Sequence, residues 1–208
     1  MAERILSPTG SRRRLSAEDR RSQIVETAAE VFIENGYQGT SLEDIAAHAG
    51  ITRPLIYHYF RDKDALYLEV LTRARAALDA AIIDRVPADA SPEEQLRGGI
   101  EGYFHFVRDH MHLWELLFGG GTAVAGAVAE EATRQRFETS EKIALLVSAA
   151  APEEPALRAN AYAHAISGAG EALTRWWQHH PEVSLEEIVE LHMDTVWRGL
   201  GPILDSLG

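Results

Sequence analysis

Side chains that can bond to a partner outside the fold gather in one short stretch, ITRPLIYHYF, at positions 51–60. Apolar residues recur there at helical spacing, and Arg53, Tyr57 and His58 fall between them. An arginine can donate two hydrogen bonds to O6 and N7 of guanine, and other side-chain donors commonly bond phosphate oxygens. The stretch therefore predicts a short helix with one buried face and one face for double-stranded DNA.

The residues before this stretch indicate two more helices. Apolar spacing predicts helices over about 17–35 and 41–48, with Gly36 ending the first in a left-handed conformation and a tight turn at 49–51 following the second. Three short helices with a glycine-containing turn between the last two form a helix-turn-helix unit, whose last helix enters the major groove. We expect the apolar face of that helix to pack on the first two helices through Ile51, Leu55 and Phe60, with Tyr59 suited to either face.

Several groups around this unit are expected to contact DNA. The amides at the start of the second helix, at Thr40 and Ser41, would hold a phosphate with the help of the helix dipole. The basic run that ends at Arg14 either reaches into the minor groove or remains a solvated tail. The expected DNA contacts are Arg14, Thr40, Ser41, Thr52 (as the cap of the third helix), Arg53, Pro54, Tyr57 and His58.

The run IVETAAEVFIENGYQGTSLEDIAAHAGITRPLIYHYFRDKDAL resembles the DNA-binding domain of TetR-family transcriptional regulators over about residues 20–66. The resemblance implies that Lys63, at the start of a fourth helix capped by Asp62, contacts a phosphate. It also implies a homodimer, a ligand-binding C-terminal domain and, usually, repression. Pro54 departs from the pattern, because a small residue is common there. The matching residues are Ile24, Ala28, Phe32, Gly36, Tyr37, Thr40, Ile45, Ala46, Ala49, Gly50, Tyr57, Phe60, Lys63 and Leu66.

The overall charge of −12 at first argues against a nucleic-acid partner. Residues 1–62, however, carry 8 Arg against 9 acidic residues, whereas the remainder carries 12 basic against 23 acidic residues. The local field at the front end matters more for phosphate binding than the total charge. The chain has no Cys, no secretory signal and no apolar run of membrane-spanning length, so we expect a cytoplasmic protein without disulfides or a membrane partner.

Helical periodicity continues to the C-terminus and no strand is expected, which predicts an all-α fold. A hydroxyl residue three positions before an acid marks helix starts at Ser16, Thr40, Ser91 and Ser184. The division we predict is a flexible basic arm (1–15), a helix-turn-helix domain (16–62) and a larger helical ligand-binding and dimerisation bundle (63–208). Its helices are expected over about 63–85, from 92 along a stripe that includes Met111, up to about 149, over 157–177 and from 185 onward, with connectors at 84–91, 118–122 and 151–155.

Large aromatic side chains are frequent in the second half of the chain. Such stripes are more often plain core, but a pocket between bundle helices is the usual place for a small-molecule effector. The residues expected to line it are Tyr103, Phe104, Met111, Trp114, Phe118, Tyr162 and Trp177. The acids Glu101, Glu115 and Glu171 would favour a cationic ligand, although a solvated or helix-paired role is the expectation for each, and the ligand class stays open.

The helix over 157–177 carries two adjacent apolar stripes, one running from Leu157 to Trp176, and is expected to be buried on two sides. Together with the last helix it would form a four-helix interface with a second copy of the chain. Such a dimer places two recognition helices on two half-sites. The expected interface residues are Ala161, Ala165, Gly168, Ala172, Trp176, Leu191 and Val196.

Nothing in the sequence indicates catalysis. The nine His show no H-E-x-x-H pattern, and Ser167 lies inside a helix without a nucleophile elbow. We therefore expect no catalytic residues, no metal and no cofactor. The main alternative to a DNA-binding regulator is a helical bundle that binds a small molecule or a protein and never binds DNA.

Overall fold

The computed structural model describes residues 15–86, 89–119 and 127–198, and every regular element in these ranges is helical. This confirms the predicted all-α fold. The elements are α1 (Ala17–Asn35), α2 (Leu42–His48), α3 (Arg53–Tyr59), α4 (Lys63–Ile83), α5 (Pro92–Asp109), α6 (Met111–Phe118), α7 (Ala127–Ala150), α8 (Ala156–Trp177) and α9 (Leu185–Met193), followed by a π-helical turn (Asp194–Arg198). No helix in the described ranges is long and apolar enough to cross a membrane.

Reciprocal capping boxes begin four of the helices. At Ser16, Ser91 and Ser184 the serine hydroxyl accepts from the third helical amide, and the acid three positions on accepts from the serine amide, as predicted. At α2 the prediction was wrong by one residue, because the cap is Ser41 with Asp44. Thr40 is instead buried, and its hydroxyl donates to the carbonyl oxygen of Gly36 at 2.8 Å.

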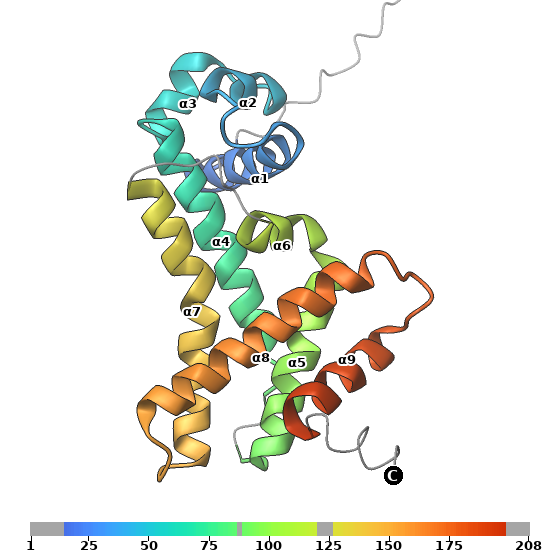
Figure 1. The fold of residues 1–208 in the computed structure, drawn as a ribbon. Helices are drawn as coiled ribbons and strands as arrows, with labels where there is room; N and C mark the ends of the chain where they lie inside the picture. The colour runs from blue at the N-terminus through green and yellow to red at the C-terminus, as the bar shows by residue number, and fades with distance from the viewer. Residues whose placement is uncertain (1–14, 87–88, 120–126, 199–208) are drawn as a thin grey trace, which may run out of the picture.

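The three N-terminal helices lie at one end of the molecule, and α4 leads from them into the remaining helices (Figure 1). One continuous core joins the two parts, because Ile24 of α1, Ile45 of α2 and Ile56 of α3 belong to the same buried cluster as Leu66 and Phe118. The first turns of α4 therefore pack as part of the N-terminal unit.

Helices α4 and α5 approach each other closely at two glycines of α5. A Cβ atom built on Gly102 would lie 2.5 Å from the carbonyl oxygen of Ala81, and one on Gly98 would lie 2.2 Å from that of Arg85. Only a residue without a side chain permits this backbone contact. Gly102 thus sets the approach of α5 to α4, and Gly98 sets its approach to Arg85 in the turn that follows α4.

Two of the predicted helices differ in the structure. The predicted fifth helix, whose stripe included Met111, is broken at His110, where φ is −139° and ψ is 42°, so that α5 ends and Met111 begins α6. The expectation that α8 is buried on two sides includes a second copy of the chain, and within the single chain only one side is buried. The buried positions of α8 form one narrow line, whereas Leu157 is 82% exposed and Trp176 is 40% exposed. That line is Ala159, Ala163, Gly170 and Thr174.

Candidate nucleic-acid interface and effector site

Helix α3 has the two faces that the sequence predicted. Ile56 and Phe60 are buried, Ile51 packs against the same core at partial burial, and Leu55 is partly buried. The opposite side is exposed along its whole length and carries Thr52, Arg53, Pro54, Tyr57 and His58. Thr52 occupies the cap position of α3, but its side chain makes no capping hydrogen bond. Its hydroxyl therefore remains available to a partner.

Glu43 of α2 contacts two side chains of this exposed face. Arg53 Nη2 lies 2.8 Å from Glu43 Oε1, and the Tyr57 hydroxyl donates to the same oxygen at 3.1 Å. The Arg53 guanidinium also lies 5.7 Å from the centre of the Tyr57 ring. One carboxylate thus holds both side chains that are best suited to contact DNA.

The sequence predicted that the amides at the start of α2 hold a phosphate. In the structure these amides are already bonded within the chain. The Ser41 amide donates to Asp44 Oδ2 at 2.9 Å, and the Thr40 amide lies 3.4 Å from the carbonyl oxygen of Tyr37. The bonds from the Ser41 hydroxyl and amide lower the pKa of Asp44, which keeps this acid charged. A phosphate contact through the Thr40 and Ser41 amides would first have to displace these acceptors. Arg14 lies outside the described residues.

Lys63, at the start of α4, closes the loop between α1 and α2. Its Nζ donates to the carbonyl oxygens of Tyr37 at 2.8 Å and Thr40 at 2.9 Å, and lies 4.2 Å from the centre of the Tyr37 ring. Two of its three N–H donors are thereby used inside the protein. The predicted phosphate contact of Lys63 stays a prediction that rests on the third donor.

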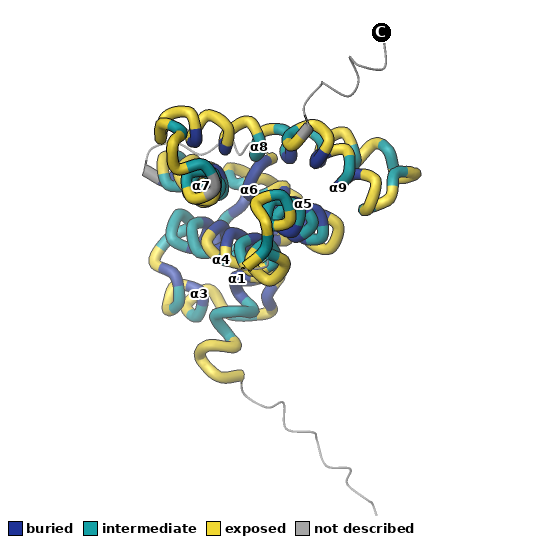
Figure 2. The backbone as a smooth tube through the Cα atoms, turned by 90° about the horizontal axis from the view of Figure 1, so that it is seen from below, coloured by how far each residue is buried: buried dark blue, intermediate teal, exposed yellow. Residues whose placement is uncertain are grey.

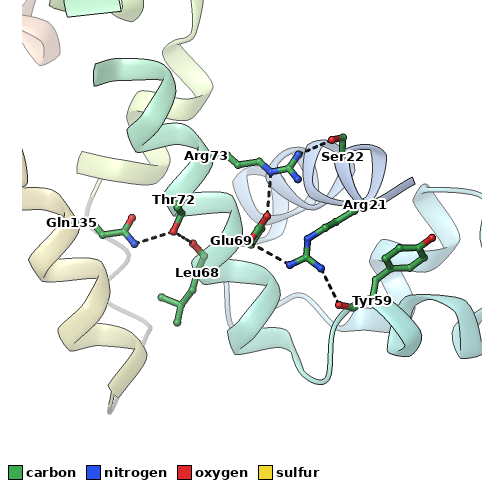
Figure 3. Close-up of polar contacts among 8 residues, drawn as sticks. All are labelled: Arg21, Ser22, Tyr59, Leu68, Glu69, Thr72, Arg73 and Gln135. Carbon is green, nitrogen blue, oxygen red and sulfur yellow. Dashed lines mark hydrogen bonds and ion pairs between the residues drawn. The ribbon is translucent and has the colours of Figure 1, made fainter. Parts of the chain in front are cut away.

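A chain of polar contacts links the recognition helix to the helical bundle (Figure 3). Arg21 of α1 donates to the carbonyl oxygen of Tyr59, the last residue of α3, and pairs with Glu69 of α4. Glu69 also accepts from Arg73, which in turn donates to Ser22 of α1.

On the other side of α4, the Thr72 hydroxyl accepts from Gln135 of α7 at 3.2 Å and donates to the carbonyl oxygen of Leu68 (Figure 3). Helix α4 is therefore bonded to the DNA-binding helices on one side and to α7 on the other.

The structure brings together most of the aromatic residues that were expected to line an effector pocket. Trp114 Nε1 donates to the Tyr103 hydroxyl at 2.7 Å, and the Trp114 and Phe118 rings are 5.5 Å apart. Phe104 joins them through Tyr103 at 5.1 Å and contacts Trp177 at 5.8 Å. These residues lie between α5, α6 and α8, and Phe104 also packs on α9.

Two other expected pocket residues are placed differently. Met111 is half-buried at the start of α6, where its sulfur accepts from Gln178 at 3.0 Å. Tyr162 is 46% exposed and bonds to Arg158 on the outer side of α8, so its assignment to the interior pocket was wrong. Tyr162 immediately precedes the buried Ala163, and one residue along a helix turns the side chain by about 100°, away from the buried line.

The outer side of α8 is exposed from end to end, and its buried positions turn toward the rest of the molecule (Figure 2). The expected dimer residues of α8 lie on that outer side, and Leu191 and Trp197 add exposed apolar area from the chain's last described turns. Val196 is half-buried. A single chain thus leaves a long apolar strip uncovered. Its α8 members are Ala161, Ala165, Gly168, Ala172 and Trp176.

Two features of these sites escaped the sequence analysis. The spacing of Glu43 from Thr40 indicates only a helix start, whereas its contact with Arg53 joins positions on two different helices. Arg75 is 4% exposed in the interior of the bundle, and the signal for it was its position four residues after Leu71 and three before Leu78 on an apolar stripe of α4. Within the described residues, no group of three or more His, Asp or Glu side chains is placed to hold a metal ion.

Known proteins resemble the chain over nearly its full length. The activator FasR of Mycolicibacterium smegmatis is 26% identical over 200 residues, which covers 94% of this chain and 91% of FasR. A TetR-like transcriptional regulator from Rhodococcus sp. RHA1 superposes with a TM-score of 0.74 at 28% identity, covering 90% of this chain and 98% of that one. The fold also matches AibR, solved with isovaleryl coenzyme A and operator DNA, with a TM-score of 0.70 at 20% identity, covering 85% and 97%.

Two family models account for most of the described residues. Residues 24–70, which hold α2, α3 and parts of α1 and α4, match the bacterial regulatory proteins of the tetR family. Residues 92–199 match the tetracyclin repressor-like C-terminal domain, which corresponds to the bundle from α5 onward. With the exposed face of α3 on a helix-turn-helix and a helical bundle joined to it through α4, the protein belongs to the TetR family of transcriptional regulators.

Proposed function

We propose that this protein is a homodimeric repressor that binds a two-fold symmetric DNA operator in the cytoplasm and leaves it when a small lipophilic effector enters the bundle. The observation that carries the proposal is the exposed face of α3, where Arg53, Tyr57 and His58 stand on a helix whose other side is fixed in the core. A helix held in this way can enter the major groove without refolding.

The dimer is supported by the uncovered strip on α8. Small residues such as Ala165 and Gly168 permit two helices to approach closely, and a second copy would bury the exposed ring of Trp176. A closed two-fold pair places two recognition helices on half-sites about one helical turn of DNA apart, roughly 34–36 Å. Each copy of α3 would then contact one half-site.

Release by an effector is supported by the position of α4. The helix shares the N-terminal core through Leu66 and Tyr67, and it bonds to α7 through Thr72. An effector that binds better when α4 has shifted changes the separation of the two α3 helices, and it acts only through that difference in affinity. The Arg21–Glu69 pair and the Arg21 bond to Tyr59 carry the shift to the end of α3.

The names of the relatives include both directions of control. FasR of M. smegmatis is called an activator. KstR2 of Mycobacterium tuberculosis, 35% identical over 44% of this chain and 46% of its own length, is called a repressor. We propose repression because an operator-bound dimer that is released by its effector blocks transcription without needing a further contact.

Selection of bound fragments from random and genomic duplexes tests the proposal. The expected result is an inverted repeat whose two halves are one helical turn apart, bound with a steep loss of affinity as salt rises, because phosphate neutralisation releases counterions. A reporter gene placed behind the recovered sequence should be silenced by the protein. If the selection enriches no DNA sequence and binding to duplexes does not depend on salt, the result would instead favour a helical bundle that does not act on DNA.

A further inference from the structure

Arg75 is a charged side chain buried inside the bundle, and it is neither a proposed DNA contact nor a helix cap. It lies on the inner stripe of α4 between Leu71 and Leu78, and only 4% of its surface is exposed. A guanidinium that is fully removed from water is costly unless its N–H donors are bonded. The contacts of Arg75 therefore decide what this position is for.

Only part of the Arg75 guanidinium is bonded within the chain. Nη1 donates to the Thr139 hydroxyl of α7. The nearest carboxylate oxygen, Asp79 Oδ1, is 4.0 Å from Nη1, and the other oxygen of Asp79 is held by Lys142 at 2.5 Å. Nε and Nη2 are buried and have no hydrogen-bond partner among the residues that the structure describes.

The two unpartnered nitrogens lie on the same edge of the guanidinium plane. The N–H bonds of Nε and Nη2 point in parallel, which is the fork that grips the two oxygens of a carboxylate side by side. Burial lowers the pKa of Arg75, although an arginine stays protonated in proteins, so the fork remains a cation in a medium of low polarity.

The surroundings of this fork are apolar on one side and hydrogen-bonding on the other. The Phe118 ring centre is 5.9 Å from the guanidinium carbon, and Trp114 packs on Phe118. Gln135, one turn of α7 before Thr139, has a buried side-chain oxygen that is also without a partner. The Arg75 guanidinium therefore adjoins the aromatic cluster that α6 contributes, and Gln135 is a second unpartnered polar group on α7, the helix that Arg75 bonds through Thr139.

We propose that Arg75 binds the carboxylate of the effector through Nε and Nη2, and that the effector is accordingly an apolar molecule with one carboxylate, its apolar part packed against Trp114 and Phe118. This inference rests on the proposed function, since it names the chemical class of the ligand of that same bundle. A ligand bound to Arg75 would act on α4 directly, and α4 also carries Thr72, Glu69 and Lys63, which link the bundle to the DNA-binding helices.

Direct binding of three matched probes tests the proposal: dodecanoate, dodecanol and dodecyl phosphate, each below its micelle concentration and followed by calorimetry on the full chain. In the wild type, dodecanoate should bind about tenfold or more tightly than dodecanol, which corresponds to one charge-assisted bidentate contact. Tighter binding of dodecyl phosphate than of dodecanoate would overturn the assignment of a carboxylate. Equal binding of dodecanoate and dodecanol, or binding of neither, would overturn the proposal.

The decisive variant is Arg75→Met, which keeps an unbranched apolar stem and removes the guanidinium with its charge. The preference for dodecanoate over dodecanol should disappear while dodecanol binds as before, an effect that a merely structural arginine would not produce. Arg75→Lys keeps the charge without the fork and should lower the preference several-fold, which preserves the test if the Met variant fails to fold. Arg97→Met is the matched control, because Arg97 pairs with Glu190 on a different part of the bundle. A preference that survives in both Arg75 variants would overturn the proposal.

Operator binding by the same preparations separates this inference from the proposed function. If the wild type binds duplex DNA with steep salt dependence but shows no preference among the probes, the ligand assignment fails and the DNA-binding function stands. If the probes bind as expected but no duplex is bound, the proposed function fails and the carboxylate site stands.

Discussion

Arg53 Nη2 of the recognition helix lies 2.8 Å from Glu43 Oε1 of the preceding helix, and the Tyr57 hydroxyl bonds to the same carboxylate oxygen. The side chains that would contact bases and phosphates are thus tied to an acid on the surface that faces DNA. The acid must release Arg53, or stay beside it and repel nearby phosphates, whenever the helix enters a groove. A DNA site that presents a guanine to Arg53 offsets this cost through two hydrogen bonds, whereas an arbitrary DNA sequence does not.

Glu43→Gln should therefore raise the affinity for arbitrary duplex DNA by about threefold to tenfold and narrow the gap between operator and non-operator binding. The substitution removes a negative charge from the DNA-facing surface and frees Arg53. Titration of labelled duplexes at fixed salt measures both affinities. Glu153→Gln, an equal change of charge on an exposed residue after α7, is the control and should leave the gap unchanged. A Glu43→Gln protein that binds arbitrary DNA no better than the wild type would contradict this role.

Lys63→Ala and Arg53→Ala should have different effects on stability. Lys63 bonds the carbonyl oxygens of Tyr37 and Thr40, so its loss should lower the free energy of unfolding by about 1–2 kcal/mol and weaken binding to all sequences alike. Arg53 forms an exposed ion pair with Glu43 and an exposed contact with the Tyr57 ring, which add little to stability, and its loss should relax base preference. Urea unfolding and duplex titration of both variants measure these effects. An Arg53→Ala protein that is as destabilised as Lys63→Ala would refute the distinction.

Ala165→Glu should convert the dimer into a monomer. The substitution places a charge in the middle of the uncovered strip of α8, where a second copy would bury it without a partner. Sedimentation at several concentrations measures the mass, and the monomer should bind operator DNA far more weakly than the wild type. Ala80→Glu, on an exposed position of α4, serves as the control. A dimer that persists in Ala165→Glu would place the interface elsewhere.

Gly102→Ala should destabilise the protein by about 1–3 kcal/mol, because the new Cβ atom meets the α4 backbone at 2.5 Å and neither helix can move without disturbing the core. Gly99→Ala on the same helix is the matched control. Its Cβ atom meets only side-chain atoms, at 3.8 Å and beyond, so the substitution should stabilise the helix by about 0.5–1 kcal/mol. Thermal unfolding followed by circular dichroism compares the two. Equal effects from both glycines would show that α4 and α5 do not depend on this contact.

His192 should make stability depend on pH. Burial lowers the pKa of His192 from 6.5 to about 4, and one ring nitrogen bonds the carbonyl oxygen of Ile166 at 3.1 Å. The pKa of His192 is lower in the folded than in the unfolded chain, so the unfolded chain takes up a proton at a higher pH. The contribution of the neutral His192 to stability is therefore fully present above pH 6.5 and is lost as the pH falls toward 4. The loss should approach roughly 3 kcal/mol across that window. His192→Gln keeps a donor for Ile166 and should lack this part of the pH dependence, as urea unfolding at several pH values would show. Identical pH profiles for the two proteins would exclude His192 as the cause.

Local sequence determined the helices and the two faces of α3. The serine and acid pairs that begin at Ser16, Ser91 and Ser184 act across three residues, so their chemistry is complete without the rest of the fold. The apolar spacing of ITRPLIYHYF likewise determined which side of α3 would be buried, because residues three or four positions apart lie on the same side of a helix. Thr40 and Ser41 both satisfied the capping pattern, and burial of Thr40 against α1 selected Ser41.

Only the tertiary structure decided which side chains from different helices meet. The contact of Glu43 with Arg53 and the unpartnered edge of Arg75 depend on how α2 meets α3 and how α4 meets α7. The sequence showed that one face of α8 is apolar, but periodicity cannot show what covers such a face. In the folded chain Leu157 and Trp176 stay exposed because the helices packed against α8 bury only the line from Ala159 to Thr174. Apolar character is a property of the residue, whereas burial is a property of the neighbours that the whole fold supplies.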